Sequence, residues 1–177
     1  LKNFGFADET TVIAPGINAK MNEVQAAFGL LQLQHIDAAL VARRAIYERY
    51  CANLANIPGL TFYSRTQHFE WNHAYYPVLI DDAYPLTRDE LYEVLKEENI
   101  YSRRYFYPLI SSFAMYRHLP SARPEHLPVA NQLAEKILCL PIYPDMDEEE
   151  QMRVINVIQR YAVKQPELAS VQRQQVA

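Results

Sequence analysis

The sequence predicts an α+β domain in which long helices lead into a small sheet with further helices packed on it. Apolar residues recur at helical spacing between Met21 and Leu54. Two short runs rich in aromatic and β-branched residues follow at 60–63 and 74–80, and capping signals then mark two later helices. A chain of 177 residues without internal repeats or low-complexity linkers is long enough to bury a core, so we expect one compact unit with two peripheral ends.

The N-terminal part predicts a short strand, a loop and a pair of helices. The Pro-Gly dipeptide at 15–16 is a turn signal that brings the chain to a helix start. Asn22 and Gln25 have the spacing of a capping box, and the broad apolar stripe that follows predicts a long and mostly buried helix. A second helical period runs to the Ile-Pro-Gly sequence at 57–59, so two helices, or one bent helix, should occupy roughly residues 21–56.

Three segments are expected to be strands. The runs at 60–63 and 74–80 have strand composition, although Pro77 cannot donate a hydrogen bond to a ladder and therefore suggests an edge strand or a bulge. The aromatic and basic segment at 100–110 predicts a further strand that runs into a loop at Pro108.

The later helices are predicted mainly from their caps. Thr87 and Glu90 form a capping box that opens one helix, and an apolar period predicts another at about 129–138. Asp147 should cap the last helix, where three glutamates in the first turn complement the helix dipole. The polar, Gln-rich residues 165–177 are expected to fray.

Composition disfavours several classes of function. The net charge of -4 provides no basic surface for nucleic acid. Cys51 and Cys139 lie in apolar stretches without close pairing, and no apolar run is long enough to span a bilayer, so we expect buried thiols and a cytoplasmic protein. Because Leu1 opens directly into a segment typical of the middle of a protein, we also expect a fragment.

One candidate site lies just before the first predicted helix. The sequence Gly-Ile-Asn-Ala-Lys at 16–20 precedes a helix N-terminus, where unpaired N–H groups and the dipole favour an anion. An amide from Asn18 and an ammonium from Lys20 suit a phosphate. The alternative is a turn glycine, a capping asparagine and a solvated lysine.

A second candidate is the segment at 102–107, which places two guanidinium groups beside three aromatic rings. This composition suits the binding of a base or sugar and of phosphates. In a strand, Arg104 would face one side, while Arg103 and Tyr105 would share the other. The alternative is an ordinary edge strand with its aromatic residues in the core.

A third candidate is His73, which with Tyr75 could line a pocket; the alternative, a structural histidine, is favoured because no poised partner is evident. The acidic run at 148–150 is better explained by the helix dipole than by metal binding, so we predict no metal site.

Several segments together resemble a known family. These segments are LKNFGF, GINAKMNEVQAAFGLLQL, NIYSRRYFYPL, AEKILCLPIYP and QMRVINVIQ. In this order and spacing they resemble the DegT/DnrJ/EryC1/StrS family of sugar-nucleotide aminotransferases, and especially the members that aminate a dTDP-4-keto-6-deoxyglucose. The resemblance covers nearly the whole chain.

The resemblance implies the C-terminal portion of a fold-type-I aminotransferase that depends on pyridoxal phosphate. Residues 1–20 would then end the large cofactor domain, 21–56 would form connecting helices, 57–164 would form the small α+β domain, and 165–177 would be the tail. The catalytic Schiff-base lysine would lie upstream of the matched residues, so this chain should have no activity alone.

The resemblance also implies roles for individual residues. Asn18 matches a donor to the cofactor phosphate of the partner subunit in a homodimer, and Lys20 a group near that cofactor or the substrate phosphates. His73 and the residues Arg103, Arg104 and Tyr105 lie in stretches that the family places near the sugar nucleotide. The sequence departs from the family pattern at Ile110, where many members carry histidine.

The implied reaction transfers an amino group, commonly from glutamate, to a nucleotide-linked 4-keto-6-deoxysugar, for polysaccharide biosynthesis such as that of lipopolysaccharide O-antigen. The partners would be that nucleotide sugar, the amino-acid donor and a second subunit, with no nucleic acid and no membrane. Two alternatives remain open: a sugar dehydratase of the same fold, in which histidine replaces the catalytic lysine, and a non-catalytic binding or dimerisation domain.

Overall fold

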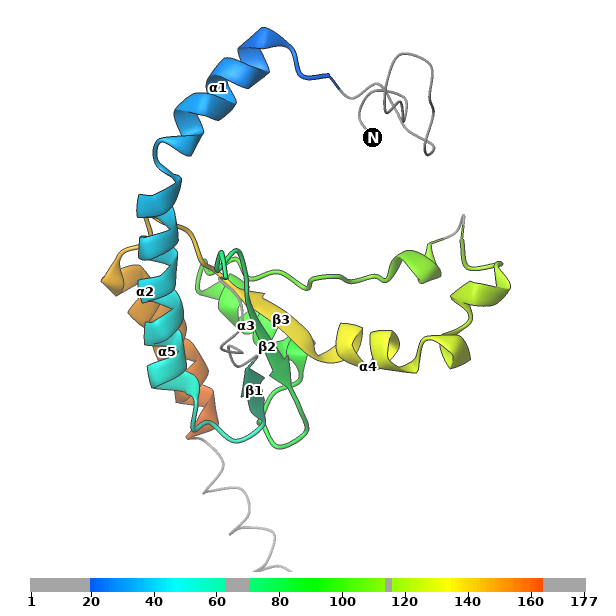
Figure 1. The fold of residues 1–177 in the computed structure, drawn as a ribbon. Coiled ribbons are helices and arrows are strands. Elements are labelled where there is room, and N and C mark those ends of the chain that lie inside the picture. Colours follow the sequence, from blue (N-terminus) through cyan, green and yellow to red (C-terminus); the bar gives the residue numbers. More distant parts are fainter. Residues whose placement is uncertain (1–19, 63–70, 114–115, 164–177) are drawn as a thin grey trace, which may run out of the picture. The chain divides into compact units, whose positions relative to one another are not determined.

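The computed structural model describes residues 20–62, 71–113 and 116–163 (Figure 1). The chain divides into two compact units, 1–39 and 40–177, which are described separately. The predicted first strand and turn, and the frayed tail, lie outside the described residues, and the four-part domain division stays a prediction. Within the described ranges, no helix has both the length and the apolar character needed to cross a membrane.

The first unit contains helix α1 (Glu23–Leu33). Its N-terminus is capped as predicted, because the side chain of Asn22 accepts a hydrogen bond from the Gln25 N–H at 2.9 Å. The expected pair of helices is confirmed, since a turn at residues 34–35 separates α1 from α2 (Ile36–Leu54).

The predicted burial of α1 is wrong for the described residues. None of its side chains is buried, and its large apolar side chains are between 56% and 80% exposed. They are Val24, Phe28, Leu30, Leu31 and Leu33. The apolar stripe exists as predicted, but no described residue packs against it closely enough to bury it.

The second unit is built on a three-stranded antiparallel sheet with the order β1-β2-β3. Its strands are β1 (Leu60–Phe62), β2 (Tyr76–Ile80) and β3 (Ile137–Leu140). Alternate residues of β2 are buried. The pairing of β2 with β3 joins segments that are about 60 residues apart in sequence.

Pro77 therefore lies in the central strand, not in an edge strand as predicted. It stands opposite Cys139, whose N–H and C=O both bond to Arg103 on the other side of β3. Pro77 and Cys139 thus form a non-hydrogen-bonded pair, and the Pro77 nitrogen faces away from β3. On the β1 side, the last described pair joins Phe62 to Val78, so the described part of that ladder does not reach Pro77.

Helices α2, α3 (Arg88–Glu97) and α5 (Glu148–Ala162) supply most of the core. Figure 1 shows α2 and α5 side by side, and the buried Gln151 joins them by donating to the Ile46 carbonyl at 2.7 Å and accepting from Arg49 at 2.6 Å. The predicted capping box at Thr87 is confirmed, and Asp147 caps α5 as predicted, where Glu150 completes a box as well. Of the box predicted at Asn22, the described residues show only the bond from the Gln25 N–H.

The predicted stop after the second helix is also confirmed. α2 ends at Leu54, and Gly59 then adopts a φ of 78°. A Cβ at Gly59 would lie 2.0 Å from the Tyr84 nitrogen, so both the backbone angle and the available space require glycine.

Two other boundaries differ from the prediction. The helix expected at 129–138 is α4 (Pro128–Lys136), which changes directly into β3. The strand expected at 100–110 is wrong, because only Arg103 forms a bridge and the Tyr107 N–H then donates to the Arg104 carbonyl at 2.8 Å. That hydrogen bond closes a turn, which prevents a continuous ladder.

Candidate functional site

The predicted phosphate site falls only partly within the described residues. Asn18 lies outside them. Lys20 is described and exposed, two residues before Asn22, the N-cap of α1. Its position relative to the helix is thus the one that the sequence predicts, and a lysine ammonium there suits an anion.

The second predicted site is the turn at 103–107, which is joined to the edge of the sheet. Arg103 donates its N–H to the Cys139 carbonyl at 2.9 Å and accepts from the Cys139 N–H at 2.7 Å. The exposed Arg103 guanidinium donates from Nη1 to the Tyr105 hydroxyl at 2.5 Å. The structure therefore brings Arg103 and Tyr105 together, with donors directed toward solvent. The edge of the Tyr75 ring packs against Tyr105 at 5.2 Å.

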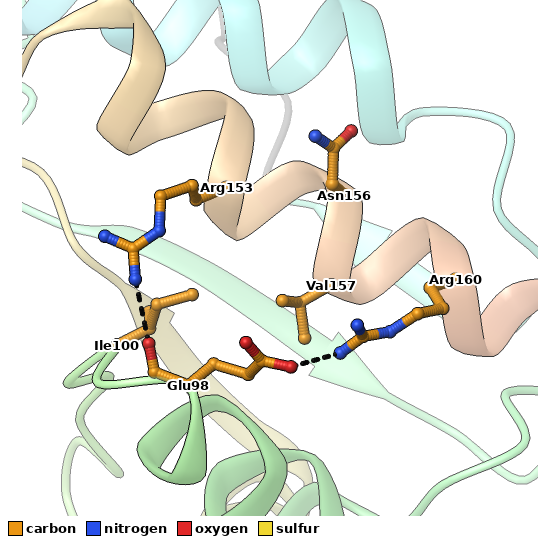
Figure 2. Close-up of a pocket in the computed structure, with 6 residues that line it drawn as sticks. All are labelled: Glu98, Ile100, Arg153, Asn156, Val157 and Arg160. Atoms are coloured by element: carbon orange, nitrogen blue, oxygen red, sulfur yellow. Dashed lines mark hydrogen bonds and ion pairs between the residues drawn. The ribbon is translucent and has the colours of Figure 1, made fainter.

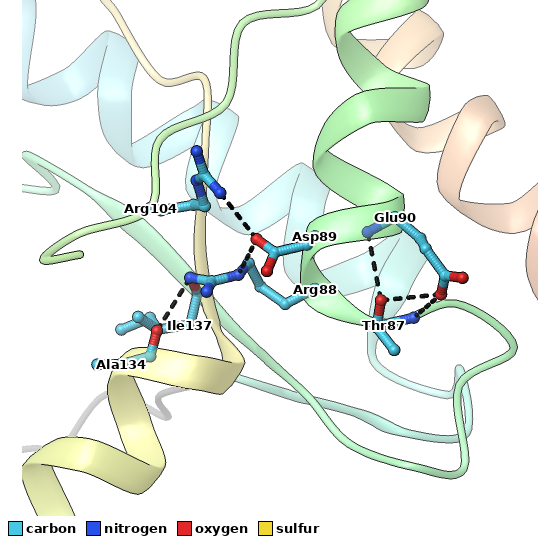
Figure 3. A network of polar contacts seen from close by, with 7 residues as sticks. All are labelled: Thr87, Arg88, Asp89, Glu90, Arg104, Ala134 and Ile137. Atoms are coloured by element: carbon cyan, nitrogen blue, oxygen red, sulfur yellow. Dashed lines mark hydrogen bonds and ion pairs between the residues drawn. The ribbon is translucent and has the colours of Figure 1, made fainter. Parts of the chain in front are cut away.

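The side chain of Arg104 makes different contacts from that of Arg103. Its Nη1 donates to Asp89 Oδ1 at 2.9 Å (Figure 3). Its guanidinium lies 4.4 Å from the centre of the Tyr92 ring. The hydrogen bond to Asp89 raises the pKa of Arg104, partly offset by desolvation. The Arg104 side chain thus contacts helix α3, whereas the Arg103 side chain contacts Tyr105 within the turn.

Arg88 also belongs to this network, although no sequence pattern pointed to it. Only 3% of its side chain is exposed, and Nη1 donates to the carbonyls of Ala134 at 2.9 Å and Ile137 at 3.3 Å (Figure 3). Its Nε lies 2.8 Å from Asp89 Oδ1, an ion pair without hydrogen-bond alignment. A charged residue in the first turn of a helix is normally solvated, so its burial here depends on contacts distant in sequence.

His73 lies apart from the arginine pair. It is buried in the segment before β2, not in a strand, with a φ of 48°. Its ring stacks on Trp71 at 5.7 Å and packs against Tyr47 at 4.9 Å. The aromatic packing of His73 agrees with the alternative of a structural histidine. Tyr75, two residues later in the sequence, packs against Tyr105 of the turn.

A separate hollow of about 220 Å³ lies between the end of α3 and α5, and Figure 2 shows its lining. Arg153 donates to the Glu98 carbonyl at 2.9 Å, and Arg160 donates to the Glu98 carboxylate at 2.6 Å. These arginines satisfy the C-terminus of α3, so the hollow has a structural explanation. None of the predicted site residues lines it.

The two cysteines are both free thiols. Burial raises the pKa of Cys139 to about 11, whereas Cys51 is partly exposed and contacts the Tyr76 hydroxyl. In the described ranges, no group of three or more metal-binding side chains comes together.

Comparisons with known proteins extend these observations. The model of the DegT/DnrJ/EryC1/StrS aminotransferase family matches residues 1–159. The chain is 50% identical over 158 residues to a dTDP-4-amino-4,6-dideoxy-D-glucose transaminase of Escherichia coli, covering 89% of the chain and 43% of that protein. It is 39% identical over 158 residues to the protein of the same name from Shigella dysenteriae, covering 89% of the chain and 42% of the relative.

Solved structures give the same result. The crystal structure of DesI in the presence of its TDP-sugar product superimposes with a TM-score of 0.76 at 33% identity, covering 98% of this chain and 44% of that one. The crystal structure of S. venezuelae DesV in complex with a ketimine intermediate gives a TM-score of 0.76 at 25% identity, covering 93% of this chain and 43% of that one. The chain therefore spans about 43% of the length of its relatives.

Proposed function

The chain belongs to the DegT/DnrJ/EryC1/StrS aminotransferase family, and from this membership we propose that it is the C-terminal portion of an aminotransferase acting on a nucleotide-linked 4-keto-6-deoxysugar. The predicted fold class, the α+β portion that follows the cofactor domain in these enzymes, is confirmed by the structural relatives. The observation that carries the proposal is the 50% identity to a dTDP-4-amino-4,6-dideoxy-D-glucose transaminase.

The proposed reaction transfers the amino group of glutamate to the keto carbon of the sugar. Pyridoxal phosphate, when bound, supplies the electron sink for this chemistry. The amide of Asn18 and the ammonium of Lys20 form a donor set that fits the phosphate of this cofactor, and the exposed position of Lys20 before α1 supports that role. We propose that both residues reach the site of a partner subunit.

Within the same proposal, Arg103 and Tyr105 of the 103–107 turn bind the sugar nucleotide. Arg103 presents an exposed guanidinium for which the described residues supply one side-chain acceptor, the Tyr105 hydroxyl, and this combination suits phosphate oxygens. His73, which is buried among aromatic rings, would shape the wall behind Tyr75 rather than touch the substrate.

The proposed functional unit is a cytoplasmic homodimer with shared active sites. The exposed apolar side chains of α1 support this proposal, because a helix that is apolar on several sides is stable in water only when other surfaces cover it. The two free thiols agree with a reducing compartment.

The direct test uses the full-length enzyme with pyridoxal phosphate, glutamate and dTDP-4-keto-6-deoxyglucose. We expect formation of 2-oxoglutarate and of the dTDP-linked amino sugar, detected by mass spectrometry, only when both substrates are present. The 177-residue chain alone is the negative control. Loss of a sugar hydroxyl without any transfer of nitrogen would favour the dehydratase, and binding without turnover would favour a non-catalytic domain.

A second test addresses the cofactor residues. In the full-length enzyme, Asn18→Ala and Lys20→Ala should each weaken binding of the cofactor or the nucleotide sugar while the circular dichroism spectrum is retained. Unchanged affinities for both ligands would return residues 16–20 to a purely structural role.

A further inference from the structure

A single carboxylate oxygen of Asp89 joins two arginines at the base of the candidate substrate site. Asp89 Oδ1 lies 2.9 Å from Arg104 Nη1 and 2.8 Å from Arg88 Nε (Figure 3). Asp89 occupies the first turn of α3, two residues after the N-cap Thr87, and the complete capping box there fixes the start of the helix. A negative charge at this end of a helix is also favoured by the dipole.

Aromatic contacts also hold the Arg104 side chain against α3. Its guanidinium lies 4.4 Å from the ring centre of Tyr92 on α3 and 5.5 Å from that of Tyr107, and Arg88 lies 4.8 Å from the Tyr107 ring centre. All contacts found for the Arg104 side chain, within the described parts of the chain, run to α3 or to Tyr107. Its guanidinium is thus an anchor between the turn and the helix.

The anchor determines where Arg103 and Tyr105 lie, because they are the immediate neighbours of Arg104. The Arg103 backbone is fixed to Cys139 at the start of the turn, and the hydrogen bond from the Tyr107 N–H to the Arg104 carbonyl closes the turn internally. The ion pair between Arg104 and Asp89 then links the turn to α3.

We propose that Asp89 is a positioning residue: through its ion pair with Arg104, it holds the 103–107 turn so that Arg103 and Tyr105 face the phosphates of the nucleotide sugar. Arg104 itself does not touch the substrate. The inference rests on the proposed function of this turn, and it assigns different tasks to two adjacent arginines. It also gives Asp89 and Arg88, which sequence reasoning did not select, a role in the site.

The first measurement tests the anchor without substrate. In the full-length enzyme, Asp89→Asn should accelerate amide hydrogen exchange in residues 103–107 by about threefold to tenfold, since an exposed charge pair contributes modestly to local stability. Glu93→Gln is the matched control. Glu93 lies on the same helix, and its side chain is 60% exposed, against 59% for Asp89. Among the ion pairs of the described residues, Glu93 pairs with Lys96 and not with a residue of the turn. The control should leave exchange in the turn unchanged.

The second measurement tests the effect on substrate. We expect Asp89→Asn to raise KM for the nucleotide sugar by about threefold to tenfold, with kcat and the KM for glutamate within about twofold of wild type. Asp89→Glu should restore part of the affinity. Thermal unfolding of each variant establishes that the enzyme is folded.

Each outcome decides the inference. Unchanged exchange in Asp89→Asn overturns the anchor, and faster exchange with an unchanged KM for the nucleotide sugar overturns its role in positioning. An equal rise in both KM values points to general damage and also overturns it. If the wild-type enzyme aminates no nucleotide sugar, the proposed function fails, and the exchange measurement still reports separately whether Asp89 holds the turn.

Discussion

Helices α1 and α5 contain similar apolar side chains but bury them to opposite extents. Five residues of α5 are buried, including Val154, Ile155 and Ile158, whereas none of α1 is buried. In α5, charged residues occupy the side opposite the core, whereas α1 is apolar on most sides and carries only Glu23 and two glutamines as polar residues. Apolar side chains on a helix favour burial against another surface, and the described residues provide such a surface only for α5.

The largest expected effect separates the two helices by their contribution to stability. Ile155→Ala should lower the free energy of unfolding by roughly 2–5 kcal/mol, because Ile155 is fully buried and its loss leaves a cavity. Leu31→Ala in α1 should change that free energy by less than about 0.5 kcal/mol, because Leu31 is 56% exposed. Urea denaturation of the 177-residue chain, followed by circular dichroism, measures both. Equal losses would show that α1 is packed in solution.

A chemical probe should show the same contrast. At pH 8, the buried Cys139 should react with iodoacetamide at least about a hundredfold more slowly than a cysteine introduced by Leu31→Cys. The reason is that burial raises the pKa of Cys139 to about 11. A raised pKa leaves less thiolate at any pH below it. Peptide mass spectrometry distinguishes the two sites. Rapid modification of Cys139 in folded protein would contradict the packing described for β3.

The smallest expected effect concerns the caps. Asp147→Ala should cost about 1 kcal/mol of unfolding free energy, since α5 belongs to the cooperative core. Asn22→Ala removes the corresponding bond to Gln25 but should cost only a few tenths of a kcal/mol in urea, because fraying of α1 exposes no buried contact. Hydrogen exchange at Gln25 should nevertheless rise. A loss at Asn22 as large as that at Asp147 would mean that the two helices unfold together.

The sequence predicted the fold where local chemistry decides it. The capping boxes at Thr87 and Asp147 and the stop at Gly59 depend on residues within a few positions of one another. Pro77 was placed wrongly because its tolerance in a central strand depends on which way its nitrogen faces, and that follows from the distant pairing of Cys139 with Arg103. The burial of α1 was overestimated because periodicity does not reveal whether a partner surface is present.

The candidate site shows the same division. Composition was sufficient to select the segment around Arg103 and Tyr105, and the structure brings these two side chains together. The separate task of Arg104 was not predictable, because it depends on Asp89 of α3. The burial of Arg88 was not predictable either, because it depends on the distant carbonyls of Ala134 and Ile137. His73 was selected from its residue type, its aromatic neighbours in sequence and the family resemblance, but its contact with Tyr47 comes from the distant helix α2.

The bridge between Arg103 and Cys139 has a consequence for self-association. An open strand edge is a template for pairing with another chain, and β3 presents such an edge on the side away from β2. Arg103 occupies both backbone groups of Cys139 at this edge, while β1, at the opposite edge, is only three residues long. A variant in which the Arg103 backbone leaves Cys139 would therefore uncover the outer edge of β3 and should aggregate more readily than wild type.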